Sequence, residues 1–351
     1  MKMQENLLDW YRINHRKLPF RESHDPYRIW VSEIMLQQTQ MDTVVPYFIR
    51  FMESFPDVFA LAQADEEMVF KAWEGLGYYS RAKNLQKGAK MMVDIYEGQF
   101  PTEYKKVLEI PGIGPYTAGA IMSIAFNKKY PAIDGNVMRV ISRVCLIHED
   151  IGKPKTRKTF EEVVANLIPE NARDFNQALM ELGALVCTPT NPKCTRCPIQ
   201  VDCRAFHEGK THELPVKSNR IKKQKEEIAV VIIRKNNQIL LVKAIEGLLA
   251  GLWSFPSEKG KSKEEAKNRL IEELDRSHGI KIEGIVERGT EKHIFTHKTW
   301  RMTVYQCQQS MSQEDRVKNK GLNNFSEWVN EDEVSHYAMS TAFKKVLKYL
   351  D

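Results

Sequence analysis

The sequence predicts a multidomain protein with an all-α N-terminal part, a cysteine-rich loop and an α+β C-terminal part. From Asn6 to about Leu182, apolar residues recur at three- and four-residue steps, which is typical of helices. The apolar run Ile228–Ile233, a turn at 235–237 and the run Gln238–Lys243 instead predict a β-hairpin. Four cysteines lie between these regions. A chain of 351 residues is long enough for two or three cores.

The remaining elements follow from local signals along the chain. Proline and glycine interrupt the helical pattern at several points, including Asp25-Pro26, Pro56-Asp57 and Phe100-Pro101. Residues 207–226 lose apolar content and end in a basic run, which predicts an exposed linker. Beyond it we expect a charged helix over Lys263–Arg276. A further strand pair is expected around Phe295 and over 301–306.

Composition excludes several classes of protein. With 28% charged and 42% apolar residues, the chain is neither disordered nor fibrous. The first residues lack the apolar core of a signal peptide, and no apolar run is long enough to span a bilayer. We therefore expect a cytoplasmic protein without membrane partners. The net charge of +6 is compatible with nucleic acid but does not establish it.

The cysteines predict a metal centre. Four of them fall within 17 residues with the spacing C-x6-C-x2-C-x5-C, namely Cys187, Cys194, Cys197 and Cys203. This pattern suits either tetrahedral zinc or an iron–sulfur cube, and spacing alone leaves both open. Arg196 and Arg204 are interleaved, so the loops could face a phosphate backbone. The two remaining cysteines, Cys145 and Cys307, are expected to be buried thiols.

The segment Leu108–Ala118 lies between two helical patterns and contains Gly112 and Gly114. Glycine permits close backbone approach, and the amides at the start of the following helix would point outward. Helix N-termini favour anions, so this turn suits a phosphate oxygen that is held without reading sequence. An ordinary tight turn between helices is the alternative.

Two carboxylates are predicted to have different environments. If Tyr27–Gln40 is helical, Glu33 has mostly apolar neighbours on its own face at Ile29, Trp30, Leu36 and Gln37. Desolvation there would favour the protonated acid. Asp134 precedes a helix in a polar turn, where free amides would favour the ionised form. A core glutamate and a plain helix N-cap are the alternatives; the pair otherwise suits an acid and a stabiliser.

Several motifs together resemble a known family. Ile110–Ala118, Ile133–Val137 and the cysteine spacing resemble the helix-hairpin-helix DNA glycosylases with an iron–sulfur loop. Trp30–Thr39 and Gly75–Arg81 narrow the resemblance to the adenine DNA glycosylases of the MutY family. The resemblance covers nearly the whole chain. It implies a [4Fe-4S] cluster at the four cysteines, and phosphate contacts at Gly112 and Gly114.

The same resemblance implies a domain organisation. Residues 1–206 would form the catalytic region, with a six-helix barrel over about 20–130 and a cluster domain from the N-terminal helix plus about 131–206. A linker at 207–226 would lead to a Nudix-like lesion-recognition domain over 227–351. Gly251–Pro256 and His293–His297 carry the C-terminal match.

Catalytic roles follow from the resemblance residue by residue. Glu33 would protonate the flipped adenine and later help to activate water, while Asp134 would support the cationic sugar. The resemblance also places Tyr116 and Asn136 beside the sugar. Related enzymes that nick the strand have a lysine at the position of Tyr116, and a phenol cannot form the imine that they use. The resemblance therefore implies a monofunctional glycosylase.

Substrate recognition is expected to be distributed over the chain. Arg21, Trp30 and Gln177 match positions that line the adenine pocket, although Phe20 stands where tryptophan is commoner. The same resemblance implies that the residues approaching 8-oxoguanine are Gln38, Thr39, Leu76, Tyr78, Phe295, Thr296 and His297. Thr296 stands where serine is common, and it keeps the hydroxyl but adds a methyl group.

The C-terminal match also predicts a lost activity. A functional Nudix helix holds metal with an Arg-Glu and a Glu-Glu pair, but alignment on Glu272-Glu273 places Asn268-Arg269 and Asp275 at the other positions. We therefore expect no pyrophosphatase activity.

The predicted function is excision of adenine paired with 8-oxoguanine or guanine in double-stranded DNA, by a monomer that initiates base excision repair. Three alternatives remain: a bifunctional endonuclease III-like enzyme, a nucleotide hydrolase and a catalytically silent DNA-binding protein. Tyr116, the broken Nudix helix and the two retained carboxylates disfavour them in turn.

Overall fold

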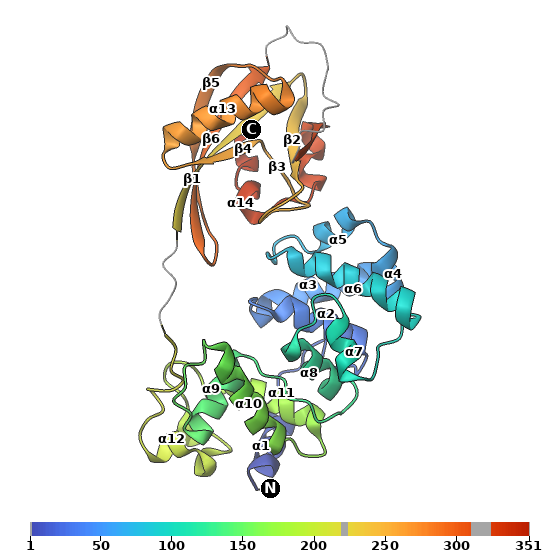
Figure 1. Cartoon of the computed structure of the whole chain (residues 1–351), viewed down its shortest axis with the longest axis vertical. Helices are drawn as coiled ribbons and strands as arrows, with labels where there is room; N and C mark the ends of the chain where they lie inside the picture. Colours follow the sequence, from blue (N-terminus) through green and yellow to red (C-terminus); the bar gives the residue numbers. More distant parts are fainter. Residues whose placement is uncertain (1, 219–223, 310–323, 351) are drawn as a thin grey trace. The chain divides into compact units, whose positions relative to one another are not determined.

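Residues 2–218, 224–309 and 324–350 are described by the computed structural model of the chain (Figure 1). The chain divides into two units. The helical unit comprises Met1–Ala64 and Lys83–Asn219, and the sheet unit comprises Asp65–Ala82 and Arg220–Asp351. The chain therefore crosses between the units three times, and a short stretch of its N-terminal half belongs to the sheet unit.

The helical unit contains helices and two short 3-10 turns in its described residues. They are α1 (Lys2–Asn14), α2 (Pro26–Leu36), α3 (Met41–Ser54), α4 (Val58–Gln63), α6 (Ser80–Tyr96, which begins in the sheet unit), α7 (Tyr104–Glu109), α8 (Pro115–Ile124), α9 (Gly135–Cys145), α10 (Pro154–Leu167), α11 (Ala172–Leu185), η1 (Cys194–Arg196), η2 (Gln200–Asp202) and α12 (Arg204–His207). No strand occurs among residues 2–218, which confirms the predicted all-α part.

Three buried helices position the site. Both α2 and α8 are apolar on nearly all sides, and the run Thr117–Ile124 is buried without a break. Gly119 makes the close packing of α8 possible, because a Cβ there would lie 2.0 Å from the carbonyl oxygen of Pro131. The third helix, α11, buries every residue from Phe175 to Gly183, including three polar side chains. Polar groups at such positions need partners, and they mark the site.

The chain after the cysteines is less exposed than the sequence predicts. Leu214 is only 2% exposed, and its carbonyl oxygen accepts a hydrogen bond from Arg143 Nε at 3.0 Å. The Val216 carbonyl likewise accepts from the amide of Ile151. Part of the predicted linker therefore packs on the helical unit. Of the two remaining thiols, Cys307 is buried as predicted, but Cys145 is only partly buried.

The sheet unit is built on a mixed sheet of seven strands in its described residues. Its elements are α5 (Glu66–Ala72), β1 (Gln224–Lys235), β2 (Gln238–Ala244), β3 (Trp253–Ser254), β4 (Ser257–Gly260), α13 (Lys263–His278), β5 (Ile282–Ile294), β6 (Lys298–Gln309), β7 (Asn324–Asn330), η3 (Glu331–His336), α14 (Thr341–Lys344) and η4 (Leu347–Tyr349). The strand order is β3-β2-β1-β6-β5, with β4 paired to β1 and β7 paired to β2. This confirms the predicted α+β part.

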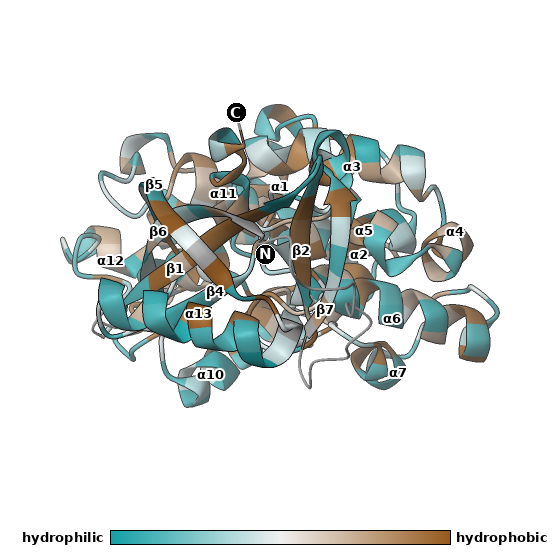
Figure 2. Cartoon of the chain, turned by 90° about the horizontal axis from the view of Figure 1, so that it is seen from above, coloured by the Kyte–Doolittle hydropathy of each residue, from teal (hydrophilic) through white to brown (hydrophobic). Residues whose placement is uncertain are grey.

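Strand β1 has a core on each face. Val230 and Ile232 point into one apolar cluster, whereas Val231 and Ile233 point into another that α13 covers. Figure 2 shows the apolar residues of β1 and β2 in brown and the hydrophilic surface of α13 in teal. The predicted hairpin is confirmed, because Arg234 pairs with Ile239 in an antiparallel register. Most of β1, however, pairs in parallel with β6.

Strands β5 and β6 form the second predicted pair, and residues 295–297 connect them. At the other end of the unit, α5 and the turn after it contact the C-terminal elements. Glu74 accepts hydrogen bonds from the Met339 amide at 3.0 Å and from Lys344 Nζ at 2.7 Å. Among the described residues, no helix combines the length and apolar character needed to cross a bilayer.

Candidate active site

A cavity of about 1120 Å³ lies within the helical unit, between α2, α8, α11 and the start of α9. Its walls include most of the residues that the sequence predicts for catalysis and adenine binding. These are Arg21, Glu33, Tyr116, Asp134, Asn136 and Gln177, and they are joined by Gln38 and Thr39 of the predicted lesion contacts and Gly114 of the predicted phosphate contacts. Ligand sites are usually concave and contain a few convergent polar groups, so this cavity is the candidate active site.

Glu33 is a buried acid whose proton is held near neutral pH. It is 6% exposed on α2, and Tyr116 Oη donates a hydrogen bond to its Oε2 at 2.5 Å. Burial raises the pKa of Glu33 from 4.5 to about 7, although the Tyr116 hydrogen bond and the charge of Arg21 oppose the shift. The expected preference for the protonated form is therefore confirmed. Helix α2 ends earlier than predicted, at Leu36, so Gln37 is its C-cap.

Asp134 is the N-cap of α9, and its environment differs from the prediction. Its Oδ1 accepts from the Val137 amide at 2.7 Å, and its Oδ2 accepts from Asn136 Nδ2 at 2.8 Å. These bonds favour the ionised form, but burial outweighs them and raises the pKa of Asp134. The prediction that the two carboxyl groups are shifted in opposite directions is therefore wrong. Desolvation by the shared cavity wall acts on both.

Asn136 links Asp134 to the cysteine-rich segment. Besides donating to Asp134, it accepts a hydrogen bond from Arg139 Nη2 at 2.8 Å. Arg139 also donates from Nε to the Cys187 carbonyl oxygen at 2.7 Å. Gly183 permits this arrangement, because a Cβ there would lie 2.6 Å from Asn136 Cβ. The orientation of Asn136 thus depends on both neighbouring helices and on the start of the cysteine loop.

The predicted hairpin joins α7 to α8 beside the cavity. Gly112 adopts φ +83°, and a Cβ there would lie 2.9 Å from Asn84 Cβ, so both conformation and space require glycine. Gly114 is the N-cap of α8 and is exposed, with Pro115 at the first helical position. The exposed start of α8 is therefore compatible with the predicted phosphate contact, which stays a prediction.

Two of the three residues predicted to line the adenine pocket lie at the cavity, and the third does not. Arg21 and Gln177 line the cavity, as does Phe20, which is 4% exposed. Trp30 does not line the cavity. It is fully buried on another face of α2, where a Cβ on Gly88 would lie 2.8 Å from its ring. A tryptophan in a buried helix can serve the core, and its neighbour in sequence, Ile29, faces the cavity instead.

The residues predicted to approach the lesion fall into two groups. Gln38 and Thr39 lie at the cavity of the helical unit, and Gln38 adopts φ +60° just past the end of α2. The other five belong to the sheet unit: Leu76, Tyr78, Phe295, Thr296 and His297.

Within the sheet unit, the structure brings the two segments of this group together. The hydroxyl groups of Tyr78 and Thr296 are hydrogen-bonded across 218 positions of sequence. Tyr78 is 41% exposed and Leu76 is 6% exposed, so only the former presents a large apolar surface. Phe295 packs edge-on against Trp300 at a centroid distance of 4.7 Å, which anchors the β5–β6 connection, and Thr296 and His297 are exposed.

The four clustered cysteines line one cavity near α9 and α11. In the part of the chain that the structure describes, no three His, Cys, Asp or Glu side chains lie close enough to share a single metal ion. Tetrahedral zinc would need the four sulfurs about 3.8 Å apart, from Zn–S bonds of about 2.3 Å. A cube of iron and sulfide spaces its thiolates more widely. Arg143 Nη1 lies 3.3 Å from Cys187 Sγ, which suits an anionic thiolate cluster, so these residues fit a [4Fe-4S] group.

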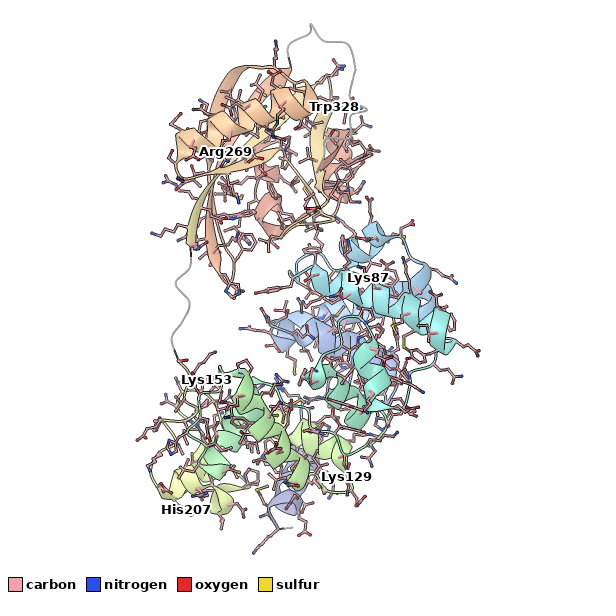
Figure 3. All side chains as sticks on the ribbon, in the orientation of Figure 1. Lys87, Lys129, Lys153, His207, Arg269 and Trp328 are labelled. Atoms are coloured by element: carbon pink, nitrogen blue, oxygen red, sulfur yellow. The ribbon has the colours of Figure 1, made fainter. Side chains whose placement is uncertain are left out.

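The Nudix-like helix does not assemble a metal site among the described residues. Arg269 of α13, labelled in Figure 3, donates to the Lys259 carbonyl oxygen at 3.2 Å and lies 3.8 Å from the Glu265 carboxylate of the same helix. Glu258 and Glu273 line a small cavity beneath the helix, and burial together with the charge of Glu273 raises the pKa of Glu258.

Sequence reasoning missed four charged residues of the cavity wall, namely Arg16, Asp42, Arg157 and Glu181, of which Arg16 and Glu181 form an ion pair. Glu181 has no exposed side-chain area and accepts hydrogen bonds from Arg16 and Arg21. A signal was available, because Glu181 follows Gln177 by four residues and therefore lies on the same face of an otherwise apolar helix.

The raised pKa of Glu33 predicts a pH-dependent stability. Because the folded-state pKa is about 7 and the usual value is 4.5, folding binds a proton between these values. The contribution of Glu33 to stability is therefore fully present below about pH 4.5 and is lost as the pH rises through 7. Glu33→Gln should match the parent at pH 4.5 and be more stable by about 3 kcal/mol at pH 8. Urea unfolding at both pH values tests this, and equal differences would contradict it.

Comparison with known proteins agrees with this site. Residues 31–166 match the HhH-GPD superfamily of base excision DNA repair proteins, and residues 228–349 match the NUDIX domain. The adenine DNA glycosylase of Homo sapiens is 33% identical over 98% of this chain and 73% of its own length. That of Arabidopsis thaliana is 36% identical over 98% of this chain, and the chain spans 64% of its length.

A bacterial relative and a solved structure agree with these matches. The adenine DNA glycosylase of Buchnera aphidicola from Acyrthosiphon pisum is 39% identical over 74% of this chain and 75% of its own length. A thermostable thymine-DNA glycosylase has a structure that matches 58% of this chain and 95% of its own, with a TM-score of 0.53 and 29% identity. The chain therefore belongs to the adenine DNA glycosylase family of base excision repair enzymes.

Proposed function

We propose that this chain removes adenine paired with 8-oxoguanine or guanine from double-stranded DNA by hydrolysis of the N-glycosidic bond. The observation that carries the proposal is Glu33, a carboxyl group protonated near neutral pH, within a cavity of about 1120 Å³. A base inside a duplex cannot reach such a cavity, so the adenine must be flipped out of the stack. Membership in the adenine DNA glycosylase family supports the choice of base.

The chemistry follows from the two carboxyl groups. Adenine is a poor leaving group until it is protonated, and Glu33 can supply the proton at the accessible N7. As the bond breaks, positive charge develops on the sugar, and the carboxylate of Asp134 stabilises it. Asn136 holds Asp134 by a hydrogen bond of 2.8 Å. Glu33, now ionised, can then assist the attack of water.

Tyr116 supports a monofunctional reaction that leaves an abasic site. Its hydroxyl donates to Glu33 at 2.5 Å, and burial raises the pKa of the phenol further above its usual value. A neutral phenol cannot form an imine with the sugar, so no Schiff base leads to strand cleavage from this position.

A single-turnover assay tests the function. Four duplexes would pair adenine with 8-oxoguanine, guanine, cytosine or thymine, and alkali would reveal abasic sites. We expect fast release opposite 8-oxoguanine, with strand breaks that require alkali. Breaks without alkali would favour the bifunctional alternative. Duplex binding without base release would favour the silent DNA-binding protein, and metal-dependent hydrolysis of 8-oxo-dGTP would favour the nucleotide hydrolase.

We also propose that the sheet unit reads the base opposite the adenine through Tyr78 and the connection between β5 and β6. The exposed ring of Tyr78 and the hydroxyl of Thr296 are joined by a hydrogen bond, so they form one element. Such an element can combine an apolar wedge with a polar contact to 8-oxoguanine. For Gln38 and Thr39, which line the cavity of the helical unit, we propose a separate contact with the DNA.

Replacing Thr296 with Ala should reduce discrimination between 8-oxoguanine and guanine by about tenfold, the loss of one hydrogen bond. Release opposite guanine should change little, because the catalytic groups are in the other unit. Single-turnover rates on the two duplexes give the ratio. An equal loss on both partners would instead point to an effect on stability, and Thr299→Ala in β6 is the matched control.

We infer that the four clustered cysteines bind a [4Fe-4S] cluster, whose bonds would tie the chain just after α11 to the turn η1 and to the start of α12. Arg196 is carried on the short turn between two of these cysteines, where its cation can contact phosphate. Purified protein should absorb broadly near ~400 nm, and Cys197→Ser should lose this band together with duplex affinity. A colourless protein containing zinc would contradict the assignment.

A further inference from the structure

Glu181 of α11 is a carboxylate enclosed by two arginines. Its side chain has no exposed area. Arg16 donates to Oε1 from its backbone amide at 3.0 Å and from Nε at 2.7 Å, and to Oε2 from Nη2 at 3.0 Å. Arg21 Nη1 donates to Oε2 at 2.9 Å. Burial alone would raise the pKa of Glu181, but the hydrogen bonds from Arg16 and the charge of Arg21 outweigh it and lower the pKa. The group therefore carries a full negative charge.

The three charged side chains share the wall of the candidate active site. Arg16, Arg21 and Glu181 all line the cavity that contains Glu33. Arg21 is the more enclosed arginine, with 13% of its side chain exposed against 34% for Arg16. It also lines a second cavity of about 220 Å³, next to Gln177. Its guanidinium is thus held by Glu181, while Arg21 lines both cavities.

Several charged groups on the neighbouring elements act on the buried carboxyl group of Glu33. Tyr116 of α8 donates a hydrogen bond to it, and the charges of Arg21 and of Asp134 at the start of α9 act on it. The other charged groups of the cavity lining are Arg16, Asp42, Arg157 and Glu181. The charge of Arg21 lowers the pKa of Glu33, whereas that of Asp134 raises it. Arg21 therefore works against the protonated acid, and its direct counter-ion is Glu181.

We propose that Glu181 is a positioning residue that holds the Arg21 guanidinium at the cavity wall and balances its positive charge beside Glu33. The inference rests on the proposed function, in which Glu33 must be protonated. It differs from a purely structural ion pair between the α1–α2 connection and α11. A structural pair would change excision equally at every pH, because it would alter only the amount of folded protein.

The test is the pH profile of single-turnover excision for Glu181→Gln. Gln keeps the size of the side chain but removes its charge, so the Arg21 cation should draw the proton from Glu33 more strongly. The alkaline limb of the profile, where the rate falls with rising pH as Glu33 ionises, should move to lower pH by on the order of half a pH unit. Glu181→Asp keeps the charge and should keep the limb at its parental position. The double variant Glu181→Gln/Arg21→Gln should return the limb toward the parent.

Two outcomes would overturn the proposal. One is a folded Glu181→Gln protein with the parental limb, and the other is a Glu181→Asp protein whose limb moves as far. Glu170→Gln is the matched control, since this exposed residue pairs only with Lys129 in the described structure and lies outside the cavity lining. If Glu181→Gln does not fold, Arg21→Gln alone must move the limb to higher pH, and an unmoved limb refutes the proposal.

A second readout does not need activity. The difference in unfolding free energy between proteins with and without Glu33→Gln follows the protonation of Glu33. Measured against pH in the parental and Glu181→Gln backgrounds, this difference should begin to grow at the same pH in both, but it should stop growing at lower pH, and at a smaller value, in the latter. A parent that excises no adenine would thus refute the proposed function, while this comparison would still support or refute the role of Glu181.

Discussion

Glu33→Gln should lower the single-turnover rate of adenine release by about 10³-fold, the contribution of a well-placed general acid. Gln fills the same space and can still accept the hydrogen bond from Tyr116, but it has no proton to give to the base. Affinity for a duplex with adenine opposite 8-oxoguanine should be nearly unchanged, because the cavity keeps its shape. Quench assays with enzyme in excess and gel-shift titrations measure the two quantities.

The pH profile of the parent provides an independent check on Glu33. Excision needs the protonated acid, so the rate should fall as the pH rises through about 7. Glu170→Gln, the same substitution beside Lys129, should behave like the parent in both assays (Figure 3). Since Glu33→Gln is expected to be the more stable protein at pH 8, a lost rate there cannot come from unfolding. Substantial residual activity would refute the role of Glu33 as the acid.

Asp134→Asn should lower the rate of excision by about 10²-fold, and it separates the charge of this residue from its structural role. Asn is as good an N-cap as Asp, so the bond to the Val137 amide and the start of α9 should be preserved. The negative charge beside the developing sugar cation is lost, together with the hydrogen bond from Asn136 to Oδ2, because the amide nitrogen of Asn cannot accept it. The alkaline limb should also move to lower pH, because the charge of Asp134 raises the pKa of Glu33.

The matched control for Asp134 is Asp57→Asn, at the exposed N-cap of α4. Asp57 accepts from the Ala60 amide at 2.8 Å, as Asp134 does from Val137 in α9, but it does not line the cavity. Thermal unfolding should show small and similar changes for both variants. Excision should fall only for Asp134→Asn, and a comparable loss in both would show that helix capping, not charge, explains the effect.

Local pattern was sufficient to predict the helical part, the hairpin from Ile228 and the burial of Glu33. The sequence also placed Asp134 correctly just before a helix, and the structure makes it the N-cap, which was the alternative interpretation. The sequence could not give the direction in which the pKa of Asp134 is shifted, because the burial of this side chain depends on contacts distant in sequence. The same limit applied to Trp30, because it belongs to a helix that is buried on nearly all sides. Periodicity shows that a helix is apolar all round, but it does not show which face meets a cavity.

Charged groups in the core were the hardest to predict. Glu181 belongs to an apolar helix, and its partners Arg16 and Arg21 lie 165 and 160 positions away. A buried carboxylate is informative only when its donors are known. The contact between Tyr78 and Thr296 could not be predicted either, although the resemblance assigned both residues to lesion recognition.

Because Asp65–Ala82 belongs to the sheet unit, a single cut in the chain cannot separate the two units intact. A cut between Asn219 and Arg220 would leave the C-terminal fragment without Phe70 and Tyr79, which are 1% and 7% exposed in the intact chain. Gly251 shows how tightly this insert fits, because a Cβ there would lie 2.4 Å from the Phe70 ring. Truncation or exchange of the C-terminal half between relatives would thus uncover an apolar surface on both pieces, and a transplant that preserves solubility would have to carry the inserted helix with it.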